Sequence, residues 1–206
     1  MDLYDGFPPG FFDRADPTPD PEFYRPPRLV THIDAGAIAA VGDLYAELGL
    51  TGRVLDLMSS WVSHFRIPPA ELVVLGMNRL ELDRNPAATE RIVHDLNADP
   101  RVPLPDGDVD AVVCCVSLDY LTHPVEVLAE AARVLRPGGT LAVTFSDRCF
   151  PTKAVRGWLS LDDDGRGRLI AELVRRTGGF DEARVELRTP PRSPGDPLWA
   201  VTAHRL

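Results

Sequence analysis

The stretch Arg53-Val-Leu-Asp-Leu-Met-Ser-Ser-Trp-Val-Ser-His64 decides the fold, because it has the pattern of a buried strand that ends abruptly in a polar loop. Its short apolar run is typical of a strand that is covered on both faces. Asp56 interrupts the run, and a buried carboxylate needs hydrogen-bond donors because an unpaired buried charge is costly. Backbone N–H groups of the loop, or a ligand, could supply those donors. In an open α/β sheet a ligand binds beyond the carboxyl ends of the strands, which here is the polar loop.

Short apolar runs and helical patterns alternate on either side of this stretch. The alternation predicts an α/β fold with a doubly wound, mainly parallel sheet. The expected strands span residues 53–58, 71–78, 91–97, 109–116, 140–145, 182–188 and 198–204. The expected helices span residues 35–48, 124–135 and 166–177, and a further short helix is expected within 80–85. Asp34 is expected to cap the first of these helices, and the turn Arg136-Pro-Gly-Gly139 is expected to end the second.

The first 27 residues are rich in proline, aspartate and aromatic residues, which leaves little room for a helix. Their phenylalanines indicate that this segment packs against another part of the protein. We therefore expect two parts, an N-terminal arm over residues 1–34 and one α/β domain over residues 35–206.

The composition excludes some classes of function. The 206 residues carry a formal net charge of -9, which argues against binding of nucleic acid or anionic lipid through a broad, positively charged surface. The longest apolar runs are far shorter than the ~20 residues of a membrane span, and no basic-then-apolar signal segment opens the sequence. The adjacent residues Cys114 and Cys115 would point to opposite faces of a strand, which argues against a disulfide between them. We expect a reduced, cytoplasmic protein with no nucleic-acid or membrane partner.

The order of elements resembles a known family. The stretch Pro103-Leu-Pro-Asp-Gly-Asp-Val-Asp-Ala-Val-Val-Cys114 and the later Glu130-Ala-Ala-Arg-Val-Leu-Arg-Pro-Gly-Gly-Thr-Leu-Ala-Val143 are similar to the fourth strand, helix and fifth strand of class I S-adenosylmethionine-dependent methyltransferases. The resemblance covers roughly residues 50–146. It implies a Rossmann-like sheet of seven strands with helices on both faces and the last strand antiparallel. It also implies S-adenosylmethionine as cofactor and a small molecule as methyl acceptor.

The loop after the first strand departs from this family, because it contains no glycine where the family usually has two or three. In one interpretation Ser59 and Ser60 replace the glycines and bind the amino acid end of the cofactor. In the other, Trp61 fills the site, and the chain is a non-catalytic, methyltransferase-like binding domain. A third hypothesis keeps the cofactor but uses it for a different reaction.

The resemblance implies a set of cofactor-binding positions at the ends of the first four strands. Asp56 corresponds to the acid that supports the first loop, the second strand ends where the family holds the ribose hydroxyls, and Asp95 corresponds to the acid near the adenine amino group. Asp56 could equally be a structural anchor for the loop. The expected cofactor-binding residues are Asp56, Met58, Ser59, Ser60, Met77, Asn78, Asp95, Leu96, Cys115 and Val116.

Residues outside these motifs are candidates for binding the acceptor or for catalysis. The expected acceptor-binding residues are Tyr24 and Arg28 before the domain, and Arg148 and Lys153 after the fifth strand, although any of these cations could simply be solvated. The candidates for a general base or a substrate-facing group are His32, His64, Asp119 and Tyr120. The histidines and cysteines lack metal-ligand spacing, so no metal is expected. We expect a monomer or a homodimer.

Overall fold

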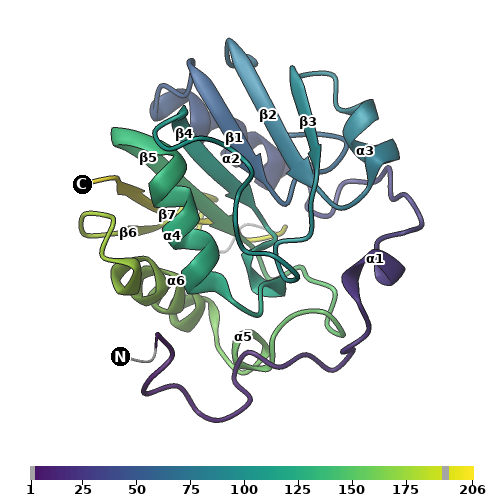
Figure 1. Ribbon diagram of the computed structural model, residues 1–206, viewed down its shortest axis with the longest axis vertical. Helices are drawn as coiled ribbons and strands as arrows, with labels where there is room; N and C mark the ends of the chain where they lie inside the picture. Colours follow the sequence, from purple (N-terminus) through teal and green to yellow (C-terminus); the bar gives the residue numbers. More distant parts are fainter. Residues whose placement is uncertain (1–2, 192–194) are drawn as a thin grey trace.

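Seven strands form one mixed sheet in the computed structural model, which describes residues 3–191 and 195–206 (Figure 1). Their order across the sheet is β3-β2-β1-β4-β5-β7-β6. The strands from β1 to β5 pair in parallel, whereas β7 is antiparallel to both of its neighbours. The strands are β1 (Arg53–Leu57), β2 (Glu71–Gly76), β3 (Glu90–Val93), β4 (Val109–Cys115), β5 (Leu135–Phe145), β6 (Arg184–Leu187) and β7 (Trp199–His204). This confirms the expected doubly wound sheet with an antiparallel last strand.

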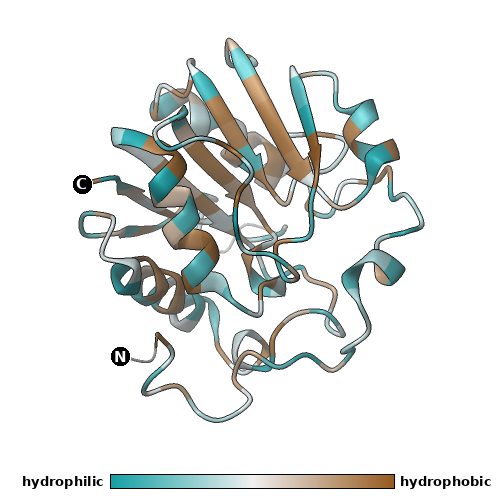
Figure 2. Cartoon of the chain, viewed as in Figure 1, coloured by the Kyte–Doolittle hydropathy of each residue, from teal (hydrophilic) through white to brown (hydrophobic). Residues whose placement is uncertain are grey.

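Helices cover both faces of the sheet. Figure 1 shows α4 in front of the sheet and α2 behind it. Successive residues of β1 point to opposite faces, so Leu55 packs in the core layer that contains α4 and α6, and Val54 packs in the layer that contains α2. The helices are α1 (Asp20–Phe23), α2 (Ala35–Glu47), α3 (Arg79–Arg84), the 3₁₀ turn η1 (Leu118–Tyr120), α4 (Pro124–Val134), α5 (Arg156–Leu159) and α6 (Asp163–Thr177). Figure 2 shows the central strands to be apolar over most of their length, as burial on both faces requires.

Side-chain caps set the helix boundaries. Asp34 accepts a hydrogen bond from the backbone N–H of Ala37 at 2.8 Å, which confirms it as the cap of α2. Asp162 caps α6 in the same way through Gly165. That helix therefore begins three residues earlier than its apolar periodicity alone predicts. It ends at Gly178, whose φ of 66° is the left-handed conformation that glycine adopts most easily.

Two of the predicted strands have different boundaries in the structure. The third is shorter than expected, because the side chain of Asp95 accepts hydrogen bonds from the N–H groups of Asn97 and Ala98 and folds residues 95–98 into a turn. The fifth is longer, since the Arg136-Pro-Gly-Gly139 turn ends α4 and then pairs as part of β5. Arg205 near the C-terminus bonds to the backbone of this segment. No helix of the described residues is both long enough and apolar enough to cross a membrane.

The N-terminal arm packs along the edge of the sheet that carries the carboxyl ends of β4 and β5 (Figure 1). Its rings form a cluster in which Phe7, Phe11 and Phe12 lie 5.0 Å apart between centroids. The guanidinium of Arg176 on α6 lies 4.5 Å from the Phe7 ring. A Cβ on Gly157 would overlap the Phe11 ring, so glycine at this position permits the close approach of the arm to α5. The arm therefore packs as the phenylalanines predict.

A buried ionic cluster fastens the arm to the segment after β5. Asp20 accepts hydrogen bonds from the Arg14 guanidinium at 2.7 and 2.9 Å and from the Asn97 amide at 2.7 Å. Lys153 is fully buried, lies 3.2 Å from the same carboxylate and donates to the carbonyl of Thr18 at 2.6 Å. Two buried cations therefore share the carboxylate of Asp20, and Lys153 has a second one, that of Asp16, at 3.4 Å.

Replacing Asp20 by alanine should lower the free energy of unfolding by about 3–5 kcal/mol, because it leaves Arg14 buried without its counter-ion and leaves Lys153 with Asp16 alone, at 3.4 Å. Urea unfolding of the two proteins measures this difference. Asp13→Ala is the matched control, since Asp13 is exposed and lies 3.9 Å from Arg156, a pair worth at most about 1 kcal/mol. Equal losses in the two variants would contradict a stabilising role for the buried cluster.

Candidate functional site

A cavity of about 400 Å³ lies at the carboxyl ends of β1, β2 and β4, where the sheet topology predicts a ligand site. Its floor is formed by the loops that follow these strands, and residues of the N-terminal arm between positions 24 and 33 cover it. Its volume is within the range of small-molecule sites.

The loop after β1 folds back onto the end of β2. The N–H of Ser59 donates to the carbonyl of Leu75 at 2.7 Å. A Cβ on Gly76 would overlap the carbonyl oxygen of Ser59, so the absence of a side chain at this position permits the approach. The loop itself turns at Met58, which has a φ of 56°. A glycine on the neighbouring strand and a strained methionine thus shape a loop that contains no glycine of its own.

Strained backbone is concentrated at this cavity. Among the described residues, Met58, His64 and Val116 are the ones other than glycine that adopt a positive φ, with values of 56°, 56° and 46°. All three line the cavity. The left-handed conformation is costly for residues with a Cβ, and most of all for a β-branched valine. Such strain persists only where the surrounding structure imposes it, and it gathers at functional sites.

The carboxylate of Asp56 is buried at the base of the cavity. The hydroxyl of Ser59 donates to it at 2.6 Å, so a side chain of the loop supplies the donor that the buried acid requires. Burial raises the pKa of Asp56 to about 6, and the hydroxyls of Ser59 and Ser63 act in the opposite direction. The carboxylate therefore anchors the loop and also lines the cavity.

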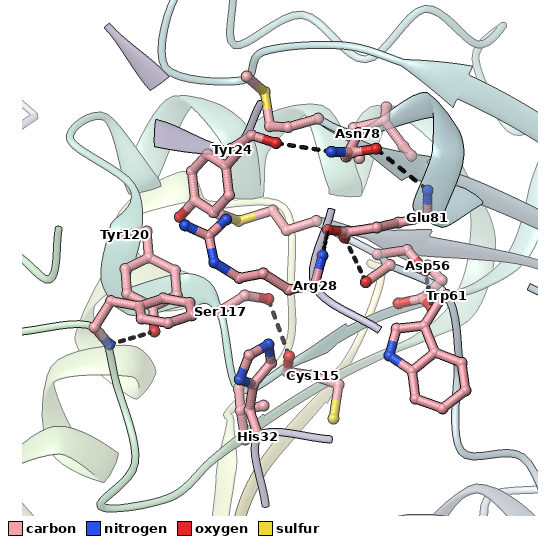
Figure 3. A pocket seen from close by; sticks show the side chains of 18 of the residues that line it. Tyr24, Arg28, His32, Asp56, Trp61, Asn78, Glu81, Cys115, Ser117 and Tyr120 are labelled. Carbon is pink, nitrogen blue, oxygen red and sulfur yellow. Dashed lines mark hydrogen bonds between the residues drawn. The ribbon is translucent and has the colours of Figure 1, made fainter. Parts of the chain in front are cut away.

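The indole of Trp61 lies at the side of the cavity and does not fill it (Figure 3). Its Nε1 donates to the carbonyl of Val30 at 3.0 Å, which holds the ring against the arm. The cavity of about 400 Å³ remains beside the ring.

Two polar side chains at the end of β2 tie the arm to the cavity wall. The amide of Asn78 donates to the carbonyls of Tyr24 and Arg25, and its oxygen caps α3. Glu81 accepts from the backbone N–H of Arg28 and from the hydroxyl of Ser60, both at 2.6 Å (Figure 3). The polar groups of Asn78 are thus already used within the protein, and Glu81 is the carboxylate that lines this side of the cavity.

The structure brings together every residue that the sequence predicts to bind the cofactor. The residues come from four strand ends, and all of them line the cavity: Asp56, Met58, Ser59, Ser60, Met77, Asn78, Asp95, Leu96, Cys115 and Val116. Of the predicted acceptor-binding residues, Tyr24, Arg28 and Arg148 also line the cavity.

Lys153 and Asp119 do not line the cavity, contrary to the sequence-based expectation. Lys153 is turned toward the arm, where Thr18 and Asp20 bind its ammonium group. The side chain of Asp119 is buried beneath the cavity wall. Sequence position alone placed both residues near the site, but the direction of each side chain is set by what packs against it.

Several lining residues escaped the sequence analysis. Asp20 and Thr31 belong to the arm, whose irregular sequence has no periodicity from which a direction could be derived. Asn97 and Phe150 lie in loops, and Phe150 contacts the rings of Phe23 and His32 at 5.5 and 5.1 Å. The sequence did contain one signal for these residues, namely the aromatic residues of the arm near Arg28. Their rings had to pack against an apolar surface of the domain.

Two of the three histidines that line the cavity, His32 and His64, have imidazoles that favour the neutral form. Burial lowers the pKa of both His32 and His64. For His32 the charge of Glu81 opposes this shift. A neutral imidazole can accept a proton from a bound molecule. Among the described residues, no group of three or more His, Cys, Asp or Glu side chains has the arrangement of a metal site.

Comparison with known proteins identifies the class to which this fold and site belong. A family model described as a methyltransferase domain matches residues 70–143, which run from β2 into β5. Over this segment the chain is similar to class I S-adenosylmethionine-dependent methyltransferases, and it has their fold.

Individual relatives agree with this class. An uncharacterized methyltransferase of Mycobacterium bovis is 29% identical over 191 residues, which make up 92% of this chain and 66% of that protein. The malonyl-acyl-carrier-protein O-methyltransferase of Methylococcus capsulatus is 28% identical over 155 residues, 66% of this chain and 54% of that protein. The chain thus spans slightly less than two thirds of the length of the first relative and about half of the second.

A solved structure shows the same fold. The crystal structure of an S-adenosylmethionine-dependent methyltransferase from Thermotoga maritima superposes with a TM-score of 0.58 at 16% identity. The match covers 83% of this chain and 91% of that one.

Asp119→Asn should make the stability of the protein less dependent on pH. The Oδ2 atom of Asp119 has no hydrogen-bond partner among the described residues, and burial raises the pKa of this carboxyl to about 8. Because an unfolded aspartate has a pKa of about 3.9, the folded protein binds more protons between these two values, and stability falls as the pH rises through this range.

Urea unfolding at pH 5 and pH 8 measures this effect. The wild type should lose stability relative to Asp119→Asn by up to about 1.4 kcal/mol per pH unit. Asp164→Asn, at an exposed position in the first turn of α6, should run parallel to the wild type. Parallel curves for wild type and Asp119→Asn would show that Asp119 stays ionised in the fold.

Proposed function

We propose that this protein transfers the methyl group of S-adenosylmethionine to a small-molecule acceptor. The observation that carries the proposal is the concentration of strained, non-glycine backbone at the carboxyl ends of β1 and β4, in a covered cavity with acidic walls. In a site that had lost its function, a β-branched residue such as Val116 would not be expected to keep a strained φ of 46°. The cavity beside Trp61 likewise favours this proposal over the binding domain with a filled site.

The donor set of the cavity fits this cofactor. S-adenosylmethionine presents an ammonium group, two ribose hydroxyls and an adenine amino group, all of which donate hydrogen bonds. Four carboxylates line the cavity, and Asp20 among them is already paired with Arg14 and Lys153. The other three follow the order of the strands, with Asp56 within β1, Glu81 after β2 and Asp95 after β3. We assign them to these three groups in that order, with the hydroxyls of Ser59 and Ser60 close to the first. The negative charge of this wall also suits a sulfonium.

When bound, the cofactor supplies a methyl group on a positively charged sulfur. The sulfur keeps the electrons of the sulfur–carbon bond as the acceptor attacks the methyl carbon. The residues of the protein align the reactants and exclude water, which such a displacement needs most. The arm closes the cavity, because Glu81, Asn78 and Trp61 bind its backbone. The neutral imidazole of His32 lines the cavity and can take a proton from the acceptor.

Four further observations support a small-molecule acceptor and a cytoplasmic location. The cavity has the size of a small-molecule site, and the relative from Methylococcus capsulatus is named for methylating a malonyl group on its carrier protein. The net charge of -9 disfavours nucleic acid as the acceptor. The three cysteines are free thiols, which suits a reducing compartment such as the cytoplasm.

Replacing Asp95 by asparagine should weaken the binding of S-adenosylhomocysteine about tenfold, because the variant loses one charge-assisted hydrogen bond, worth roughly 1.5 kcal/mol. Asparagine can still cap the turn at residues 95–98, so the fold should be retained. Isothermal titration calorimetry measures the two affinities.

Asp99→Asn is the matched control for this titration. Its carboxylate also accepts from a backbone N–H, that of Arg101 at 3.0 Å, but Asp99 does not line the cavity. The control should bind S-adenosylhomocysteine like the wild type. A folded wild-type protein that binds neither this compound nor S-adenosylmethionine would refute the proposed function.

A further inference from the structure

Arg28 is a cation in the cavity wall without an acidic partner. The protein has 31 acidic residues and 22 Lys and Arg residues, so carboxylates are in excess. The other guanidinium that lines the cavity, that of Arg148, lies 3.0 Å from Asp196. Among the described residues, no carboxylate lies within 4.0 Å of the Arg28 guanidinium. A half-buried arginine left unpaired in an acidic protein is unusual, because a carboxylate partner would stabilise it.

The guanidinium of Arg28 is held in place while part of it stays free. It donates to the carbonyl of Phe23 at 3.0 Å and more weakly to that of Pro26 at 3.4 Å. The rings of Phe23, Phe150 and Tyr24 lie 4.6, 5.4 and 5.8 Å from its central carbon. A guanidinium has five N–H donors, and two are used, so three are left for a ligand. The charge is therefore pre-positioned, which reduces the entropy that a ligand must lose to bind it.

The position of this guanidinium separates it from the proposed cofactor-binding wall. Figure 3 shows the side chain leaving the Glu81 side of the cavity and extending toward Tyr24 and Tyr120. Tyr120 follows β4 and Phe150 follows β5, whereas the three carboxylates assigned to the cofactor lie within β1 and after β2 and β3. The free N–H groups thus lie among aromatic rings on the opposite side from the cofactor.

We propose that Arg28 binds a carboxylate of the acceptor, and that the rings of Tyr120 and Phe150 hold the apolar body of the same molecule. This inference rests on the proposed methyltransferase function and specifies its substrate class as a carboxylic acid with an apolar body. A planar guanidinium matches a carboxylate with two parallel hydrogen bonds. The nearest acid of the arm in the cavity wall, Asp20, is already bound by Arg14 and Lys153, so it does not compete for Arg28.

The test measures ligand binding to protein saturated with S-adenosylhomocysteine. Benzoate and hexanoate are compared by calorimetry with benzamide and hexanamide, which have the same shape but no charge. The wild type should bind each carboxylate at least tenfold more tightly than its amide. Arg28→Met should abolish this preference, and Arg28→Lys should keep only part of it, because an ammonium lacks the planar fork.

Arg25→Met is the matched control, because Arg25 lies on the same segment of the arm and is exposed. It should retain the full preference for carboxylates. Thermal unfolding of each variant verifies that the arm and domain remain folded. Loss of the preference in Arg25→Met and Arg28→Met alike would overturn the proposal, because the effect would then come from the total charge of the arm.

A second comparison determines whether Arg28 binds the carboxylate of the cofactor instead. S-adenosylhomocysteine has a carboxylate, and 5′-methylthioadenosine has none. The ratio of their affinities should change less than twofold in Arg28→Met. A ratio that falls tenfold would assign Arg28 to the cofactor and overturn the proposal.

The failures of the two proposals are distinguishable. Tight binding of S-adenosylhomocysteine without any preference for carboxylates would overturn the role of Arg28 and leave the methyltransferase function standing. No binding of S-adenosylhomocysteine would overturn the proposed function and, with it, the role of Arg28 as an acceptor anchor.

Discussion

The contact between the carbonyl of Ser59 and the bare Cα of Gly76 is the constraint on which the site depends. It lets the loop after β1 lie against the end of β2, where the N–H of Ser59 bonds to Leu75. The hydroxyl of Ser59 then reaches the buried carboxylate of Asp56. With this loop folded back, the space above the sheet stays open as a cavity. The strain at Met58 is sustained because the contacts on either side of it fix the backbone.

The N-terminal arm completes the cavity and is fixed at both ends. Before the cavity, Asp20 joins Arg14 and Lys153 in a buried cluster. After it, the carboxylate of Asp34 caps α2 and accepts from the N–H of Asp196 near β7. Between these anchors the covering segment has no helix or strand beyond α1, and hydrogen bonds from Trp61, Asn78 and Glu81 hold its backbone against the cavity.

Charge is distributed unevenly around the cavity, so that one side of the site is acidic and the other carries arginines and aromatic rings. Acidic side chains follow β1, β2 and β3, whereas Arg28, Arg148 and the aromatic rings lie toward the loops after β4 and β5. A positively charged cofactor and an anionic acceptor would be attracted to opposite sides. The imidazole of His32, whose pKa is lowered by burial, contacts Phe150 on the second side.

The sequence by itself determined the alternation of strands and helices, the Asp34 cap and the residues at the ends of the strands, because apolar periodicity is local and parallel strands end at one edge. All the expected cofactor-binding positions could therefore be located in one cavity. Only the tertiary structure decided the direction of side chains in irregular segments. It turned Lys153 into the ionic cluster, buried Asp119 without a partner for its Oδ2, and left Arg28 unpaired among rings. These outcomes depend on which distant residues pack against each side chain, and no local pattern encodes that.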